Sequence, residues 1–123
     1  MAFRSGSKRQ RIGWRREEAA LQYLTAQGLR AVLRNYQCRA GEIDLVMIDS
    51  EVLVSVEVRF RSSHSHGGAL ASIDTYKQRR WIRATEYLLS TSPKLAQRCV
   101  RFDVVALQGE QADIVWLKDV IRL

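Results

Sequence analysis

Two segments of the chain carry apolar residues at intervals of three and four, the spacing of an amphipathic helix. The first covers residues 14–27, and Gly28 follows it where a left-handed turn commonly ends a helix. The second covers residues 73–89, with Ser72 placed to cap its start and Pro93 placed to stop its extension. The apolar positions are Ala20, Leu21 and Leu24 in the first segment and Ile73, Trp81, Ala84 and Leu88 in the second.

Five shorter segments predict strands, and the second and third are rich in Val, Ile and Leu, as is typical of strands buried on both faces. They cover residues 31–36, 43–48, 52–60, 101–107 and 114–117. Residues 49–51 form a tight turn between the second and third runs, which predicts an antiparallel hairpin. The order is helix, three strands, helix and two strands. It is typical of a mixed α/β fold in which a central five-stranded mixed sheet has a helix on either face.

The size of the chain, 123 residues, predicts one compact domain. Residues 13–123 are expected to form this domain, and residues 1–12 a flexible basic arm. The formal charge is +7, but the first 16 residues carry six basic and no acidic side chains, whereas the remaining 107 carry 14 basic and 13 acidic ones. The arm could bring the protein to phosphates, or it could be a solubilising tail; composition favours neither.

Several classes of protein are disfavoured by composition. No apolar run approaches the roughly 18 residues that span a bilayer, and no signal peptide follows the basic N-terminus. Cys38 and Cys99 match neither a disulfide framework nor the spacing of a zinc site. His64 and His66 lie in a glycine-containing loop without a further zinc ligand at suitable spacing. We therefore expect a cytoplasmic protein without a membrane partner.

Two acids interrupt the apolar strands: Asp44 near the start of the second strand and Glu57 near the end of the third. Charged residues rarely lie in such runs unless they are paired or bind a metal. The hairpin turn places Glu57 opposite residue 43, within one residue of Asp44. Side chains alternate along a strand, so Glu57 and Arg59 share one face. The two carboxyl groups are therefore expected to converge at one end of the sheet.

Converging carboxylates repel each other, which raises a pKa or recruits a cation. Mg²⁺ (or Mn²⁺) suits such oxygen ligands, completed by a backbone carbonyl and water. A cation there could neutralise charge on a phosphodiester, with Arg59 holding the phosphate or the attacking water. Glu17 lies on the inner side of the first helix and could supply a third carboxylate. The basic residues expected to contact nucleic acid are Lys77, Arg80, Arg61, Arg11 and Arg15.

Structural explanations compete with each of these assignments. Asp44 and Glu57 could form ion pairs with Arg59 or Arg39 at a strand end. Glu17 could be a first-turn acid that the helix dipole favours. Other basic side chains of the second helix could simply be solvated, and Lys77 could extend from the edge of the core. A further buried acid, Asp103, is expected to pair with Arg101 or Arg83.

The same residues match a known pattern. Asp44, Glu57 and Arg59 resemble the Asp…Glu-x-Lys signature of restriction-endonuclease-like nucleases. After the basic arm, nearly the whole chain resembles the YraN-like family of uncharacterised bacterial proteins and, more distantly, the archaeal Holliday-junction resolvases. The matching positions are Glu17, Ala20, Tyr23, Leu24, Gly28, Asn35-Tyr36, Gly41-Glu42-Ile43-Asp44-Leu45, Val56-Glu57-Val58-Arg59, Lys77 and Arg101-Phe102-Asp103-Val104.

This resemblance implies a restriction-endonuclease-like fold, nucleic-acid binding and Mg²⁺-dependent cleavage of structured or branched DNA by a homodimer. It assigns Asp44, Glu57 and Glu17 as metal ligands. Two positions depart from the family pattern: Arg16 replaces a glycine and Arg59 replaces a lysine. Arginine keeps the charge but does not lose a proton near neutral pH, so Arg59 cannot be a general base. The alternatives are a non-catalytic DNA-binding module with the nuclease fold and a protein-interaction domain without nucleic acid.

Overall fold

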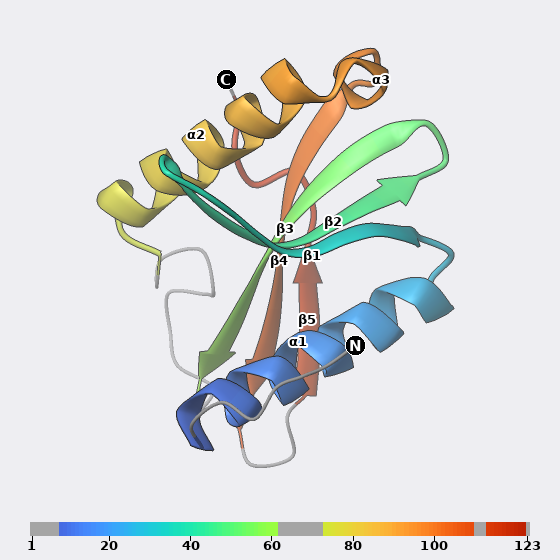
Figure 1. Ribbon diagram of the computed structural model, residues 1–123. Helices are drawn as coiled ribbons and strands as arrows, with labels where there is room; N and C mark the ends of the chain where they lie inside the picture. Colours follow the sequence, from blue (N-terminus) through green and yellow to red (C-terminus); the bar gives the residue numbers. More distant parts are fainter. Residues whose placement is uncertain (1–7, 62–72, 110–112, 123) are drawn as a thin grey trace.

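The computed structural model describes residues 8–61, 73–109 and 113–122, with side chains from residue 14 onward. A five-stranded sheet lies between two long helices, one on each face (Figure 1). The elements are α1 (Lys8–Ala26), β1 (Arg30–Cys38), β2 (Gly41–Asp49), β3 (Val52–Arg61), α2 (Thr75–Thr91), α3 (Pro93–Ala96), β4 (Val100–Gln108) and β5 (Asp113–Leu117). The predicted mixed α/β architecture is confirmed, and only the short helix α3 was not predicted.

The strands lie in the order β1-β2-β3-β4-β5. Neighbours are antiparallel except β3 and β4, which are parallel because the chain crosses through α2 and α3 between them. The predicted hairpin of β2 and β3 is confirmed, with Ser50 in its turn at a φ of 57°. Gly28 ends α1 in the predicted left-handed conformation, at a φ of 102°. None of the described helices is long and apolar enough to cross a membrane.

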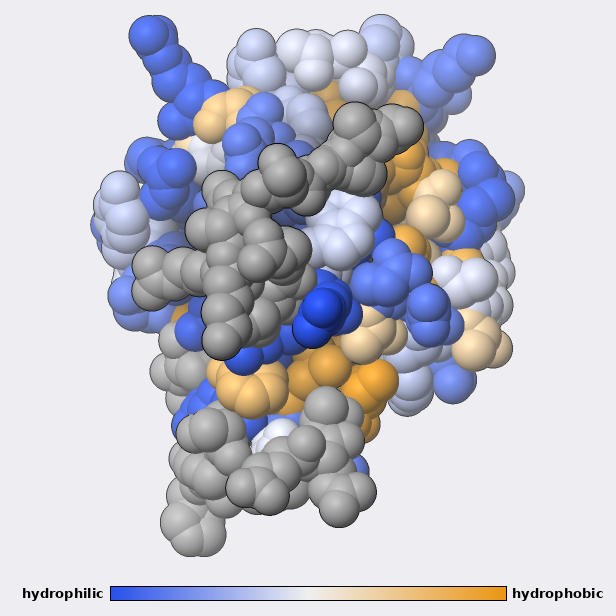
Figure 2. Space-filling view, turned by 60° about the horizontal axis from the view of Figure 1, so that its bottom comes forward, coloured by the Kyte–Doolittle hydropathy of each residue, from blue (hydrophilic) through white to orange (hydrophobic). Residues whose placement is uncertain are grey.

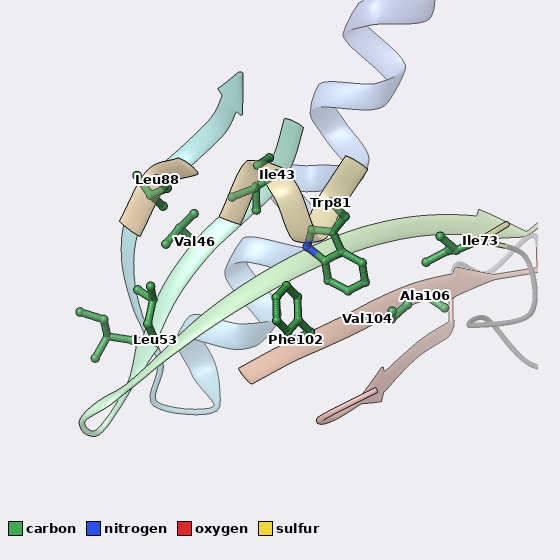
Figure 3. Packing of buried hydrophobic residues seen from close by; sticks show 11 residues of the cluster. Ile43, Val46, Leu53, Ile73, Trp81, Leu88, Phe102, Val104 and Ala106 are labelled. Atoms are coloured by element: carbon green, nitrogen blue, oxygen red, sulfur yellow. The ribbon is translucent and has the colours of Figure 1, made fainter. Parts of the chain in front are cut away.

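Each helix covers a separate hydrophobic cluster. On the α2 side, Trp81 packs edge-on against Phe102 of β4, with 5.3 Å between the ring centroids (Figure 3). The indole N–H of Trp81 donates to Ser55 Oγ at 2.8 Å, so this buried polar group is satisfied. On the α1 side, Ala20 and Leu24 pack against side chains of β2, β3 and β4. Strands β3 and β4 thus lie in the middle of the sheet, covered on both faces.

The helices start at different residues from those predicted. Helix α1 begins at Lys8, so residues 8–12 of the expected arm are helical, and residues 1–7 lie outside the described part of the chain. Helix α2 begins after Asp74, whose Oδ1 accepts a hydrogen bond from the backbone N–H of Lys77 at 2.8 Å. Asp74 therefore provides the N-cap assigned to Ser72. Ser72, His64 and His66 fall within residues 62–72, which the structure does not describe.

The buried acid of β4 has a structural explanation. Asp103 is fully buried and forms an ion pair with Arg101, at 3.0 Å, as predicted. Its carboxyl group also accepts hydrogen bonds from the indole N–H of Trp116 at 3.0 Å and the backbone N–H of Asp119 at 2.9 Å. These partners satisfy the charge and tie β5 and the C-terminal segment to the sheet. Asp103 therefore lies outside the candidate site.

The turn end of the β1–β2 hairpin lies directly against α2. A Cβ atom added to Gly41 would lie 2.4 Å from the carbonyl oxygen of Arg80. Real Cβ atoms do not approach backbone oxygens so closely, so only glycine permits this contact. The position matters because Gly41 opens the segment that carries Glu42 and Asp44.

We predict that Gly41→Ala destabilises the protein by about 1–3 kcal/mol, because the hairpin must move away from α2 to accommodate a methyl group. Chemical unfolding monitored by Trp fluorescence measures this change. The exposed substitution Arg39→Ala in the same β1–β2 turn serves as control and is expected to stay within about 0.5 kcal/mol of the wild type. Equal stability of Gly41→Ala and the wild type would show that the close contact is not a constraint.

Candidate functional site

Strands β2 and β3 separate where the two predicted acids lie. Their backbone pairing runs from Asp49 opposite Val52 to Leu45 opposite Val56 and goes no further. The next pair in this register would be Asp44 and Glu57, so the predicted pairing is correct to within one residue. Instead of a backbone bond, the N–H of Val58 donates to Oδ2 of Asp44 at 2.8 Å. The Asp44 side chain thus occupies the place where the ladder would continue.

The alternation of side chains also breaks at Asp44. Ile43 lies in the α2-side cluster, whereas Leu45, only two residues later, lies in the α1-side cluster. In a regular strand these two side chains would share a face. The position opposite Asp44 on β1 is Asn35, which has a φ of 55°. Both strands of the hairpin therefore bend at this point, and Figure 1 shows them curving from the sheet toward α2.

Three carboxyl groups from three elements meet at this bend. Asp44 of β2 shares a side-chain hydrogen bond with Glu57 of β3 and another with Glu17 of α1. Two carboxyl groups can share a hydrogen bond only when one of them carries a proton, so this arrangement retains protons. The predicted convergence of these acids is therefore observed. The other carboxyl oxygen of Glu17, Oε1, is buried and accepts no hydrogen bond from the described part of the protein.

The carboxyl groups line an open cleft of about 340 Å³. Its walls also contain Glu42 of β2, Arg59 and Phe60 of β3, and Arg16 of α1. The cleft thus combines acidic groups with two guanidinium groups. It lies between the middle of α1, which carries Arg16 and Glu17, and the end of β3. The N-terminal half of α1 and the end of β3 are close together at the lower end of the molecule in Figure 1. This end is brought forward in Figure 2, where hydrophilic side chains adjoin smaller hydrophobic patches.

A second cleft, of about 220 Å³, lies on the other side of Glu42 and Glu57, which line both. It is bounded by Tyr76, Lys77 and Arg80 of α2, together with Asp74 and Trp81. Two basic residues predicted to contact nucleic acid, Lys77 and Arg80, are therefore adjacent to the carboxyl groups.

The pKa values of the three acids are raised. Burial, followed by the charge of Asp44, raises the pKa of Glu57 to about 9, although Arg59 lowers it in part. The same two causes raise the pKa of Glu17 to about 7. Burial also raises the pKa of Asp44, opposed by the hydrogen bond from Val58. The group as a whole therefore retains protons at neutral pH when no cation is bound.

The chemistry of these donors fits a hard divalent cation. All of the side-chain donors are carboxyl oxygens, one of them buried without a partner, and a cation would replace the protons that now relieve their repulsion. As they are placed, the described acids and cysteines form no group of three with the geometry of a metal site. The residues that fit such a cation are therefore Asp44 and Glu57, and a backbone carbonyl and water would complete the ligand set. Glu17 lies next to them.

The remaining predicted residues are distributed around these clefts. Arg59 lies beside Glu57, as predicted. Arg39, the alternative ion-pair partner, is exposed on the β1–β2 turn. Arg61 follows the cleft at the end of β3, and Arg15 is exposed on α1. The side chain of Arg11 lies outside the described residues.

Two charged residues of the cleft were missed. Glu42 lies two residues before Asp44 in the sequence, and this spacing was a usable signal. Arg16 precedes Glu17 and was treated only as a departure from the family pattern. Its guanidinium carbon lies 3.8 Å from the centroid of the Phe60 ring, a contact that no local pattern reveals.

We predict that the free energy of unfolding of the metal-free protein falls as the pH rises from about 5 to about 9. Unfolded glutamates lose their protons near pH 4.5, whereas folded Glu17 and Glu57 keep theirs to about pH 7 and 9. The folded state therefore binds more protons across this window, and its stability is lost as they dissociate. Glu57→Gln should be more stable than the wild type at pH 8 by roughly 1–3 kcal/mol, because Glu57 must take up a proton on folding at this pH and glutamine need not.

Urea unfolding at several pH values measures how the free energy of unfolding of the wild type and of Glu57→Gln depends on pH. Glu51→Gln, an exposed change in the β2–β3 turn, should keep the wild-type pH dependence. The assignment is wrong if Glu57→Gln and the wild type depend on pH identically.

Comparison with known proteins shows that both clefts lie within the part of the chain that matches a protein family. The model of "Uncharacterised protein family UPF0102" matches residues 16–107, which include every described residue of both clefts. A UPF0102 protein of Alkalilimnicola ehrlichii is 52% identical over 107 residues, covering 86% of this chain and 82% of that protein. A UPF0102 protein of Pseudomonas entomophila is 47% identical over 106 residues, covering 84% and 86%. The predicted YraN-like resemblance is confirmed, and the chain belongs to the uncharacterised family UPF0102.

Proposed function

We propose that the protein binds structured or branched DNA and cleaves its phosphodiester backbone with Mg²⁺ or Mn²⁺. The observation that carries this proposal is the meeting of Glu17, Asp44 and Glu57 from three separate elements in one open cleft. A protein gains no stability from three uncompensated buried acids, so their convergence points to a ligand. A divalent cation is the ligand that best matches their oxygen atoms.

Each residue has a distinct role in this proposal. Asp44 and Glu57 would hold the cation, and Glu17 would orient a neighbouring water or complete the ligand set. When bound, the ion would neutralise negative charge on the phosphodiester. Arg59 and Arg16 would hold phosphate oxygens, because both line the cleft and keep their charge at any relevant pH. Arg59 cannot remove a proton from the attacking water, so this proton must pass to another acceptor.

The DNA would extend beyond the cleft along basic side chains. Lys77 and Arg80 border the second cleft beside Glu57, and Arg61 and Arg15 lie near the first. Their position supports contacts with phosphates on either side of the reacting group. The contact of Arg11 with nucleic acid and the homodimeric assembly stay predictions.

We predict that the wild-type protein cleaves flap, junction or single-stranded DNA in Mg²⁺ or Mn²⁺, and that Asp44→Asn and Glu57→Gln each reduce the rate by at least about 100-fold. Gel analysis of end-labelled substrates measures the rate. Glu51→Gln, an exposed acid outside both clefts, should leave it unchanged. Cleavage that persists unchanged in an Asp44→Asn/Glu57→Gln double variant would exclude this cleft as its source.

A non-catalytic DNA-binding module is the second candidate, and Arg59 is the observation that favours it. Without a lysine at this position, the cleft has its cation-binding acids but lacks the usual basic group. Arg59→Lys separates the two candidates. Activity in the wild type supports the nuclease, whereas cleavage gained only by Arg59→Lys supports a binding module that retains the fold.

We predict that DNA affinity falls with salt and that Lys77→Ala and Arg80→Ala each weaken binding, because each removes one phosphate contact. Removing such a contact should make the slope of log K against log[salt] shallower by about one unit. Fluorescence anisotropy at several salt concentrations measures the slope. Lys94→Ala, on α3 at the opposite end of the molecule, is the matched control. Salt-independent binding, or none, would favour the protein-interaction domain.

A further inference from the structure

An exposed aromatic ring lies on each side of the carboxyl groups. Phe60 borders the first cleft and is 38% exposed, and Tyr76 borders the second and is 68% exposed. An arginine lies against each ring. The guanidinium carbon of Arg16 is 3.8 Å from the Phe60 centroid, and that of Arg80 is 5.8 Å from the Tyr76 centroid. The two clefts therefore contain the same pair of groups, an aromatic ring and a guanidinium.

The position of these pairs sets them apart from other exposed apolar residues. Glu42 and Glu57 line both clefts, so the carboxyl site lies between Phe60 and Tyr76. Tyr87 of α2 is also exposed, at 50%, but it lines neither cleft. Exposed aromatic rings cost solvation free energy, and two of them beside one charged site are better explained by a flat, partly apolar ligand than by chance.

Nucleobases are ligands of this kind. Their faces stack on aromatic rings and guanidinium planes, whereas their phosphates require cations. In a continuous duplex, neighbouring bases cover these faces, so neither ring could reach one. A strand with unpaired bases exposes them on both sides of a phosphate. The arrangement of ring, acids and ring therefore matches an unpaired strand better than it matches an intact duplex.

We infer that the site takes a single-stranded or splayed segment of nucleic acid, with one base stacked on Phe60, another on Tyr76 and the phosphate between them at the carboxyl groups. The position of the phosphate at the carboxyl groups rests on the proposed function. The stacking of the bases on Phe60 and Tyr76 does not require that the protein cleaves the strand. In branched DNA, the unpaired nucleotides at the branch point are the segment that would fit.

The test is binding without cleavage. Wild-type protein and variants are titrated, in EDTA at pH 6, into a labelled single strand, a forked duplex and a blunt duplex of the same sequence. At this pH, Glu17 and Glu57 keep their protons, which reduces their repulsion of the phosphates. We expect the single strand and the fork to bind at least fivefold more tightly than the blunt duplex. Tyr76→Ala and Phe60→Ala should each weaken binding of the unpaired strands about fivefold or more, and duplex binding less than twofold.

Two further variants separate stacking from general damage. Tyr76→Phe keeps the ring and should bind like the wild type. Tyr87→Ala removes another exposed ring of α2, outside the clefts, and should have no effect. A strand that carries 2-aminopurine should lose fluorescence on binding to the wild type but not to Tyr76→Ala/Phe60→Ala. Thermal unfolding of each variant identifies those that fail to fold.

The outcomes distinguish this inference from the proposed nuclease. Preferential binding of unpaired strands that depends on both rings supports base stacking, even if no variant cleaves DNA. Equal binding of duplex and single strand, or equal effects of Tyr76→Ala and Tyr87→Ala, overturns base stacking, even if the carboxyl groups prove catalytic.

Discussion

The arrangement of this molecule depends on one interaction, the hydrogen bond from the backbone N–H of Val58 to the carboxyl group of Asp44. A backbone N–H inside a sheet needs an acceptor, and the usual one would be a carbonyl of β2. Because Asp44 supplies the acceptor from its side chain, the two strands can separate without leaving this donor unsatisfied. The separation opens the sheet at Glu57. Without it, the backbone of Glu57 would pair with β2. The separation also lets β2 bend toward α2, where Gly41 contacts Arg80.

The two buried acids Asp103 and Glu57 differ in how the protein satisfies their charge. Asp103 is balanced by Arg101 and by two N–H donors, so it stabilises the join between β4 and β5. Glu57 shares its hydrogen bond with another acid, and burial raises its pKa to about 9. The first acid is satisfied by the protein itself. The second is satisfied only by a proton or an external cation, and this difference separates a structural acid from a candidate ligand.

Most of the fold could be predicted because its signals are local. The valine-rich strands, the short turn at Ser50 and the glycine after α1 each follow from a few neighbouring residues. The pairing of Asp44 with Glu57 followed from the length of one turn. The rest depends on contacts between distant segments. The left-handed conformation of Asn35 bends the hairpin, and asparagine tolerates this conformation without imposing it. Likewise, Arg16 joins the cleft only because α1 lies beside the end of β3.

The balance of charge in the first cleft limits how it can work. Four carboxyl groups line it, those of Glu17, Glu42, Asp44 and Glu57, against the two guanidinium groups of Arg16 and Arg59. If all the acids ionise, the cleft is negative and repels a phosphate. An anionic strand can therefore enter only when protons or a divalent cation offset the excess, and a bound strand must in turn strengthen cation binding. Under the proposed function, the cation would therefore serve first to admit the nucleic acid. This requirement applies equally to a nuclease and to a binding module, so it does not depend on how Arg59 limits the chemistry.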